Sequence, residues 1–233
     1  MTRAPARVLI LDYDGTLAPF QVRPERAVPY PGVEEALDEI MGAARSRVVI
    51  VTGRTVADLL PLLNLRRRPE LWGAHGWERL LPDGRGARAE LDQDVRRRLN
   101  EGERRARELA RVGARIETKP ASVALHWRGT SALAADGELE LLEFDGGLEL
   151  RARGCNKQHA VTAVLAETPR DAAVAYLGDD FTDEDAFAAV KPRGLAVLVR
   201  PESRETAADV WIRPPRELIA FLKRWRDACG GAP

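Results

Sequence analysis

The 233-residue chain is predicted to fold as an α/β core that carries an inserted α+β module. The core is indicated by short apolar runs that alternate with helical periodicity near both ends of the sequence. The insertion is indicated by a long arginine- and glutamate-rich helical segment followed by alternating strands. We therefore expect a core of residues 1–84 and 153–233, interrupted by an insertion of residues 85–152.

The core elements follow from the apolar patterning. Residues 7–11 and 47–51 are short, predominantly apolar runs, which are typical of strands buried on both faces of a parallel sheet. Pro214 and Pro215 suit the beginning of the last helix. Further strands are expected at 173–177, 195–199 and 210–212, and helices at 33–44, 55–63, 157–166, 183–190 and 216–228.

Within the insertion, a helix is expected at residues 90–111. Strands at 115–118 and 122–127 would form a hairpin that turns at Pro120 and Ala121. Residues 137–144 and 148–152 are expected to add strand or short helix.

Composition excludes several classes of function. The formal net charge is zero, which argues against a nucleic-acid partner, and the arginine runs at 66–68 and 96–98 are typical of solvated faces. No apolar stretch approaches the roughly 20 residues that span a membrane, and the N-terminus lacks the pattern of a signal peptide. Cys155 and Cys229 cannot form a disulfide framework or a zinc ligand set. We expect a cytoplasmic monomer.

Polar side chains follow three of the expected core strands. The carboxyl ends of parallel strands meet at one edge of a sheet, so these side chains are expected to converge there. Clustered carboxylates repel one another unless a cation lies among them, and hard oxygen ligands favour Mg²⁺. We expect Mg²⁺ as the cofactor, and Asp180 and Asp183 could either bind it directly or position its water molecules. The strand-end residues are Asp12 and Asp14, Thr52 and Arg54, and Asp179 and Asp180, of which Asp12, Asp14, Asp179 and Asp180 are the expected metal ligands.

These residue types suit phosphoryl transfer. Asp12 is placed to attack phosphorus and form an aspartyl-phosphate, while Asp14 is the candidate general acid and base. Thr52 and Lys157 are placed to hold the phosphoryl oxygens. Each motif alone is often an ordinary turn or helix cap, but their order and strand-end positions favour a catalytic site.

The same motifs resemble those of the haloacid-dehalogenase-like phosphatases. The resemblance rests on Asp12-Tyr13-Asp14-Gly15-Thr16-Leu17, Thr52-Gly53-Arg54, Lys157 and Gly178-Asp179-Asp180. It implies Mg²⁺-dependent phosphoryl transfer to Asp12.

A narrower resemblance to trehalose-6-phosphate phosphatases extends over longer segments. It rests on residues 12–19, on Val51-Thr52-Gly53-Arg54, on residues 178–187, on Gly73-Ala74-His75-Gly76-Trp77-Glu78, and on residues 117–122 with His126-Trp127-Arg128. This resemblance implies a Rossmann-like parallel-sheet core, a cap inserted between the second and third motifs, and a sugar phosphate substrate, specifically trehalose 6-phosphate. The substrate-binding residues that it implies are Gly53, Arg54, His75, Glu117, Lys119 and Ser122.

Other interpretations of these residues stay open. Glu117 and Lys119 lie on one face of a strand, where they could bind sugar hydroxyls or form a cross-strand ion pair. His75 could contact substrate or be a core histidine, and His126 and Arg128 could shape the cap or face water.

The sequence also departs from the family pattern at Ala152 and Gln158, and residues 128–148 are short for a cap. These departures keep open a phosphatase for another sugar or polyol phosphate. A phosphomutase shares the first chemical step, and a non-catalytic sugar-phosphate sensor is a third alternative, disfavoured because both Asp12 and Asp14 are present.

Overall fold

The computed structural model describes residues 4–21, 23–43, 46–110, 115–119, 121–126, 139–144, 147–153 and 156–230. The chain divides into two compact units, Met1–Ala87 with Lys157–Pro233, and Arg88–Asn156. The predictions made for Pro120, Trp127, Arg128, Cys155 and residues 137–138 lie outside the described residues.

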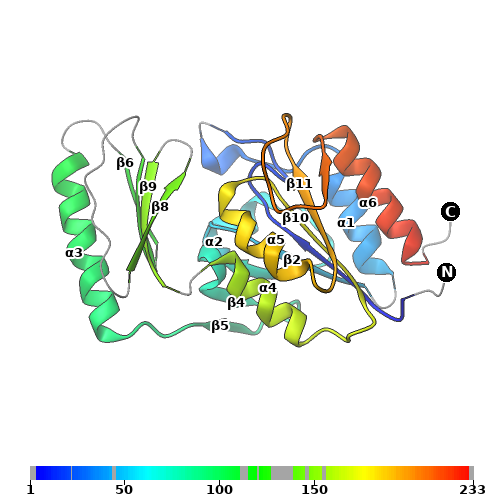
Figure 1. The fold of residues 1–233 in the computed structure, drawn as a ribbon, viewed down its shortest axis with the longest axis horizontal. Helices are drawn as coiled ribbons and strands as arrows, with labels where there is room; N and C mark the ends of the chain where they lie inside the picture. The colour runs from blue at the N-terminus through cyan, green and yellow to red at the C-terminus, as the bar shows by residue number, and fades with distance from the viewer. Residues whose placement is uncertain are drawn as a thin grey trace. The chain divides into compact units, whose positions relative to one another are not determined.

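The first unit is built on an eight-stranded sheet in the order β12-β11-β10-β1-β2-β3-β4-β5 (Figure 1). Neighbouring strands from β12 to β3 run parallel, and β4 pairs antiparallel with β3. The predicted α/β core with a parallel sheet is therefore confirmed. The strands are β1 (Arg7–Leu11), β2 (Ser46–Val51), β3 (Glu70–Gly73), β4 (Glu78–Leu80), β5 (Gly86–Arg88), β10 (Ala173–Gly178), β11 (Leu195–Val199) and β12 (Val210–Ile212).

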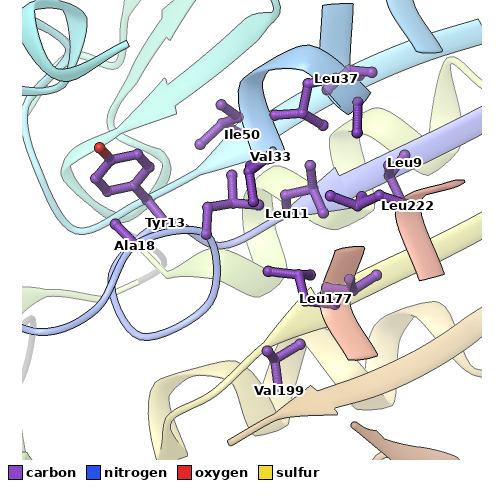
Figure 2. Packing of buried hydrophobic residues seen from close by; sticks show 14 of the residues in the cluster. Leu9, Leu11, Tyr13, Ala18, Val33, Leu37, Ile50, Leu177, Val199 and Leu222 are labelled. Atoms are coloured by element: carbon purple, nitrogen blue, oxygen red, sulfur yellow. The ribbon is translucent and has the colours of Figure 1, made fainter. Parts of the chain in front are cut away.

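Helices cover both faces of this sheet (Figure 1). The helices of the first unit are α1 (Val33–Gly42), α2 (Val56–Leu59), α4 (Lys157–Ala166), α5 (Glu184–Val190) and α6 (Arg216–Ala228). Helices α1 and α6 contribute to one hydrophobic core, and α4 and α5 contribute to a second. Side chains alternate along a strand, so Leu9 and Leu11 of β1 enter the first core while Val8 and Ile10 enter the second. Figure 2 shows Leu9 and Leu11 packed with Leu37 and Leu222.

The helix expected at residues 55–63 is shorter than predicted. Thr55 caps α2 by accepting a hydrogen bond from the Asp58 amide at 3.1 Å. The chain then tightens into a 3₁₀ turn at Leu60–Leu62, at a point where Pro61 has no amide hydrogen to donate.

The order of the strands creates a switch point beside β1. From β1 the sheet extends through β2 and β3 on one side and through β10 and β11 on the other. The helices that follow β1 and β10 therefore contribute to different cores, and the carboxyl ends of these two strands are the position at which open α/β sheets bind ligands. Asp12 and Asp179 lie at this position.

The second unit contains a four-stranded antiparallel sheet in the order β6-β7-β9-β8 and one long helix. Val95, Leu99 and Ala106 lie on one face of the helix and are buried. On the same face, a Cβ atom at Gly102 would lie 2.6 Å from Leu150, so glycine permits close packing against β9. The elements are α3 (Gln93–Ala110), β6 (Arg115–Lys119), β7 (Ser122–His126), β8 (Leu139–Phe144) and β9 (Gly147–Ala152).

Among the described residues, no helix combines the length and the apolar character that a membrane crossing requires.

Candidate active site

Asp12 follows β1 and is held rigidly at the switch point. Its amide donates to the Leu177 carbonyl at 2.8 Å, which continues the pairing of β1 with β10. The side chain is buried, and its Oδ1 atom accepts a hydrogen bond from Lys157 Nζ at 2.6 Å. Within the described part of the chain, the buried Oδ2 atom has no hydrogen-bond partner. One carboxylate oxygen is thus oriented by a cation while the other is available for chemistry.

Two further aspartates complete a buried acidic cluster. Oxygen atoms of Asp12, Asp179 and Asp183 all lie within 4.8 Å of one another. Asp183 is fully buried, and its Oδ1 atom accepts from Lys157 Nζ at 2.7 Å and from the Tyr176 hydroxyl at 2.5 Å. The amides of Asp179 and Asp180 each donate to Asp183 Oδ2 at 3.0 Å. Asp183 therefore organises the loop after β10.

Burial dominates the electrostatics of the cluster. It raises the pKa of the Asp12 carboxyl to about 7, although the charge of Lys157 opposes the rise. Burial and the charges of Asp12 and Asp183 also raise the pKa of Asp179 well above its ordinary value. Burial alone would lower the pKa of Lys157, but Asp12 and Asp183 outweigh this effect and raise it. Lys157 is therefore a permanent cation, and its single charge does not neutralise all three carboxyl groups when they are ionised.

The cluster fits a divalent cation that prefers oxygen ligands. Asp12 Oδ2 and Asp179 Oδ1 are buried and without hydrogen-bond partners among the described residues, which is costly unless a cation or a proton satisfies them. The turn at Gly15 adopts a φ of +81°, and a Cβ atom there would lie 2.1 Å from Asp179 Oδ2. Glycine thus keeps the space beside these oxygens open.

Asp14 and Asp180 have other partners in this structure. Arg54 donates two hydrogen bonds to the Asp14 carboxylate, at 2.7 and 2.6 Å. Asp180 Oδ1 accepts from the Phe181 amide at 2.7 Å and caps the short helical turn that follows. Thr52 is buried, and its hydroxyl accepts from the Arg54 amide at 3.1 Å. The expected strand-end residues therefore share one edge of the sheet, and the most closely grouped oxygens are those of Asp12, Asp179 and Asp183.

His75 lies against the segment after β2. A Cβ atom at Gly53 would lie 2.6 Å from the imidazole of His75, so only glycine leaves room for this ring. Ala74 and His75 have φ values of 47° and 57°, a left-handed conformation that costs about 1 kcal/mol or more per residue. The Ala74 and His75 amides donate to the carbonyls of Arg54 and Thr52 at 2.6 and 2.9 Å, which ties the strained turn to the Thr52–Arg54 segment.

The remaining predicted residues lie in the second unit. Lys119 Nζ lies 3.6 Å from Glu117 Oε1 and 3.7 Å from Glu149 Oε1. Glu149 also accepts a hydrogen bond from the Ser122 hydroxyl at 2.5 Å. The three residues singled out in the sequence therefore belong to one polar cluster on β6, β7 and β9.

Two members of these clusters were not anticipated. Tyr176 lies in the buried strand β10, among apolar residues, and nothing in the sequence signals that its hydroxyl reaches Asp183. Glu149 joins Lys119 and Ser122 only because β9 pairs with β7, a register that the sequence pattern does not specify.

The parallel sheet with acidic residues at its switch point has the fold of the haloacid-dehalogenase-like proteins. Solved structures share this fold. A haloacid dehalogenase-like hydrolase from B. subtilis aligns with a TM-score of 0.67 at 17% identity, over 93% of this chain and 99% of that one. The C-terminal domain of trehalose-6-phosphate phosphatase from C. albicans aligns with a TM-score of 0.79 at 21% identity, over 96% of this chain and 93% of that one.

Within this class, the chain belongs to the trehalose-phosphatase family, whose model matches residues 10–144 and 131–211. The trehalose-phosphate phosphatase of Mycobacterium marinum is 32% identical over 94% of this chain and 61% of its own length. The corresponding protein of Mycobacterium bovis is 30% identical over the full chain and 64% of its own length. The chain thus spans about three fifths of these relatives.

Proposed function

We propose that this protein is a Mg²⁺-dependent phosphatase that hydrolyses trehalose 6-phosphate to trehalose and phosphate through an aspartyl-phosphate on Asp12. The supporting observation is the Asp12 carboxylate itself, which is buried, oriented by Lys157 through Oδ1, and free of hydrogen bonds from the described residues at Oδ2. Family membership supports the reaction and the substrate. The scarcity of cysteine supports a cytoplasmic site of action, and a monomer suffices for this chemistry.

In the first step, Asp12 Oδ2 attacks the phosphorus atom and the bond to the sugar oxygen breaks. Asp14 donates a proton to the departing alkoxide. In the second step, Asp14 takes a proton from a water molecule whose oxygen attacks the phosphorus, and the bond from Asp12 to phosphorus breaks. Free phosphate leaves and both carboxylates return to their starting states.

In this structure Arg54 occupies both oxygens of the Asp14 carboxylate. Asp14 can transfer a proton only when the substrate takes over part of this interaction. The Asp14 side chain is 28% exposed and that of Arg54 is 13% exposed, so the ion pair is open to an entering ligand. We propose that Arg54, with Gly53 and His75 beside it, contacts the substrate. Thr52 and Lys157 hold the phosphoryl oxygens and stabilise their charge in the transition state.

Mg²⁺ would be held by Asp12 and Asp179, with Asp180 and the main-chain carbonyl of Asp14 as the further ligands that we propose. This arrangement leaves the Asp14 side chain free to carry a proton. Asp183 serves these ligands indirectly, because Lys157, Tyr176 and two backbone amides already occupy its oxygens. When bound, Mg²⁺ supplies positive charge that lets an anionic carboxylate approach an anionic phosphate.

The second unit is proposed to act as the cap that recognises the sugar. Glu117, Lys119 and Ser122 form a cluster with both hydrogen-bond donors and acceptors, which is the combination that sugar hydroxyls require. This assignment makes the disaccharide the specificity-determining part of the substrate.

Phosphate release from a panel of substrates tests the proposal. With Mg²⁺ present, kcat/KM for trehalose 6-phosphate should exceed that for glucose 6-phosphate and for polyol phosphates. A clear preference for another sugar phosphate would remove trehalose 6-phosphate as the substrate, and binding without turnover would favour a sensor. In ¹⁸O-labelled water the released phosphate should carry ¹⁸O, whereas a phosphomutase would transfer the group to a second sugar position.

A further inference from the structure

Two arginines outside the catalytic motifs contact the backbone of the metal-binding loop. Arg200 follows β11 and donates to the Asp179 carbonyl at 3.1 Å. Arg204, four residues further on, donates to the Asp180 carbonyl at 2.8 Å. Its guanidinium also pairs with Glu184, donates to the Glu205 carbonyl, and lies 4.5 Å from the centre of the Phe181 ring. Both arginines lie in the segment after β11 and contact the loop after β10.

These contacts fix two consecutive peptide groups at both ends. The peptide between Asp179 and Asp180 has its carbonyl bound by Arg200 and its amide bound by Asp183 Oδ2 at 3.0 Å. The next peptide, between Asp180 and Phe181, has its carbonyl bound by Arg204 and its amide bound by Asp180 Oδ1 at 2.7 Å. Neither peptide plane can rotate without breaking a hydrogen bond, so the backbone positions from which the Asp179 and Asp180 side chains extend are held in place.

The loop that carries Arg204 is itself tied to the site. Glu184, the first residue of α5, accepts hydrogen bonds from the Thr206 hydroxyl at 2.8 Å and from the Ala207 amide at 2.7 Å. Arg204 and Glu184 are both largely shielded from water, with side-chain exposures of 12% and 27%. The ion pair thus closes a ring of contacts that joins residues 200–207 to the loop that begins at Asp179.

We propose that Arg204 is a positioning residue, assisted by Arg200, that holds the Asp179–Asp180 loop in the geometry required for binding Mg²⁺. The inference rests on the proposed function only in taking this loop as the metal site. Arg204 touches neither phosphate nor metal and acts through the backbone of the ligands.

The test compares Arg204→Met with Arg193→Met in the full chain. Arg193 is a matched control because its guanidinium also donates to backbone carbonyls, those of Leu165, Thr168 and Pro169, in the same unit but away from the acidic cluster. The Kd for Mg²⁺ is measured by calorimetry without substrate, and the melting temperature is measured in EDTA. Arg204→Met should weaken Mg²⁺ binding by about tenfold, whereas Arg193→Met should lower the melting temperature and leave the Kd unchanged.

A second variant keeps the test decisive. Arg204→Lys retains one donor for the Asp180 carbonyl and should recover part of the lost affinity, which a purely structural role does not predict. Arg200→Met carries the same prediction if Arg204→Met does not fold. Equal Mg²⁺ affinity in wild type and in the folded variants would overturn the proposal. If wild type binds Mg²⁺ but releases no phosphate from trehalose 6-phosphate, the proposed substrate fails while the role of Arg204 stands.

Discussion

The raised pKa of Asp12 links metal binding to pH. Because burial raises this pKa to about 7, with Lys157 opposing, a substantial fraction of the metal-free protein carries a proton on Asp12 below that pH. A metal ligand must be deprotonated, so Mg²⁺ binding at the proposed site would displace this proton. The consequence is a proton release that accompanies binding.

We therefore predict that Mg²⁺ affinity rises between pH 6 and pH 8, by up to about tenfold per pH unit for one displaced proton below the pKa. Calorimetry in buffers of different ionisation enthalpy measures both the Kd and the protons released. The same Kd and no proton release across this range would contradict the protonation state described for Asp12.

The predictability of individual site residues depended on where their partners lie in the sequence. The convergence of Asp12, Thr52 and Asp179 at one edge of the sheet could be predicted because each directly follows a strand, and parallel strands bring these ends together. The pairing of Asp14 with Arg54 could not be predicted, because the two residues lie 40 positions apart and only the folded geometry brings them together. The left-handed turn at Ala74 and His75 is likewise imposed by tertiary contacts, since neither residue type favours it as glycine does.

Among the structural elements, β3 and β4 are joined to β2 and α4 by a network of charged side chains. Arg47 pairs with Glu70 at 2.6 Å and with Glu167 at 2.8 Å, and Arg79 pairs with the same two carboxylates at 2.8 and 2.7 Å. Hydrogen bonds from Arg79, helped by Arg47 and opposed by partial burial, lower the pKa of Glu167 to about 2.

Glu167 is predicted to stabilise the fold in a pH-dependent manner. Its pKa is 4.5 when unperturbed and about 2 in the fold, so its contribution is complete above pH 4.5 and is lost as pH falls toward 2. Glu167→Gln should lower the free energy of unfolding at pH 7 by about 1 kcal/mol, because the pairs are partly exposed and screened. Urea unfolding at pH 7 and pH 4 measures this difference, which should narrow at pH 4. An unchanged difference would contradict the role of the ion pairs.

The sequence pattern predicted the long apolar strands of the sheet and missed the short strands β3, β4 and β5. Strands β1, β2 and β10 were predicted because they are apolar runs buried on both faces. Strand β3 has only four residues and begins with Glu70, which is buried against two arginines that are distant in the sequence. Strands β4 and β5 have three residues each and contain arginine, so local pattern does not distinguish them from loops.

We propose that the first unit carries out the chemistry and that the second unit recognises the sugar. If the Glu117, Lys119 and Ser122 cluster binds the disaccharide, Lys119→Met should raise KM for trehalose 6-phosphate by about tenfold, the cost of one charge-assisted hydrogen bond. The rate with para-nitrophenyl phosphate, which lacks a sugar, should not change. Lys223→Met, an exposed lysine on α6, is the matched control.

Steady-state kinetics with both substrates measure this effect. A parallel loss of activity toward both would place Lys119 in the fold or the chemistry, and no loss toward either would remove it from the site. Membership of the family, which the sequence motifs predicted, is confirmed. The identity of the sugar stays a prediction, because the residues proposed to bind it come together only through the pairing of β6, β7 and β9.

Phosphate release by Asp12→Asn tests most directly whether Asp12 carries the phosphoryl group. Asparagine matches aspartate in shape, so the variant should fold, but its amide is a poor nucleophile. With Mg²⁺ and trehalose 6-phosphate, wild type should release phosphate and Asp12→Asn should be slower by a factor of at least about 1,000 in kcat. Release of phosphate by a folded Asp12→Asn variant at the rate of wild type would contradict the mechanism.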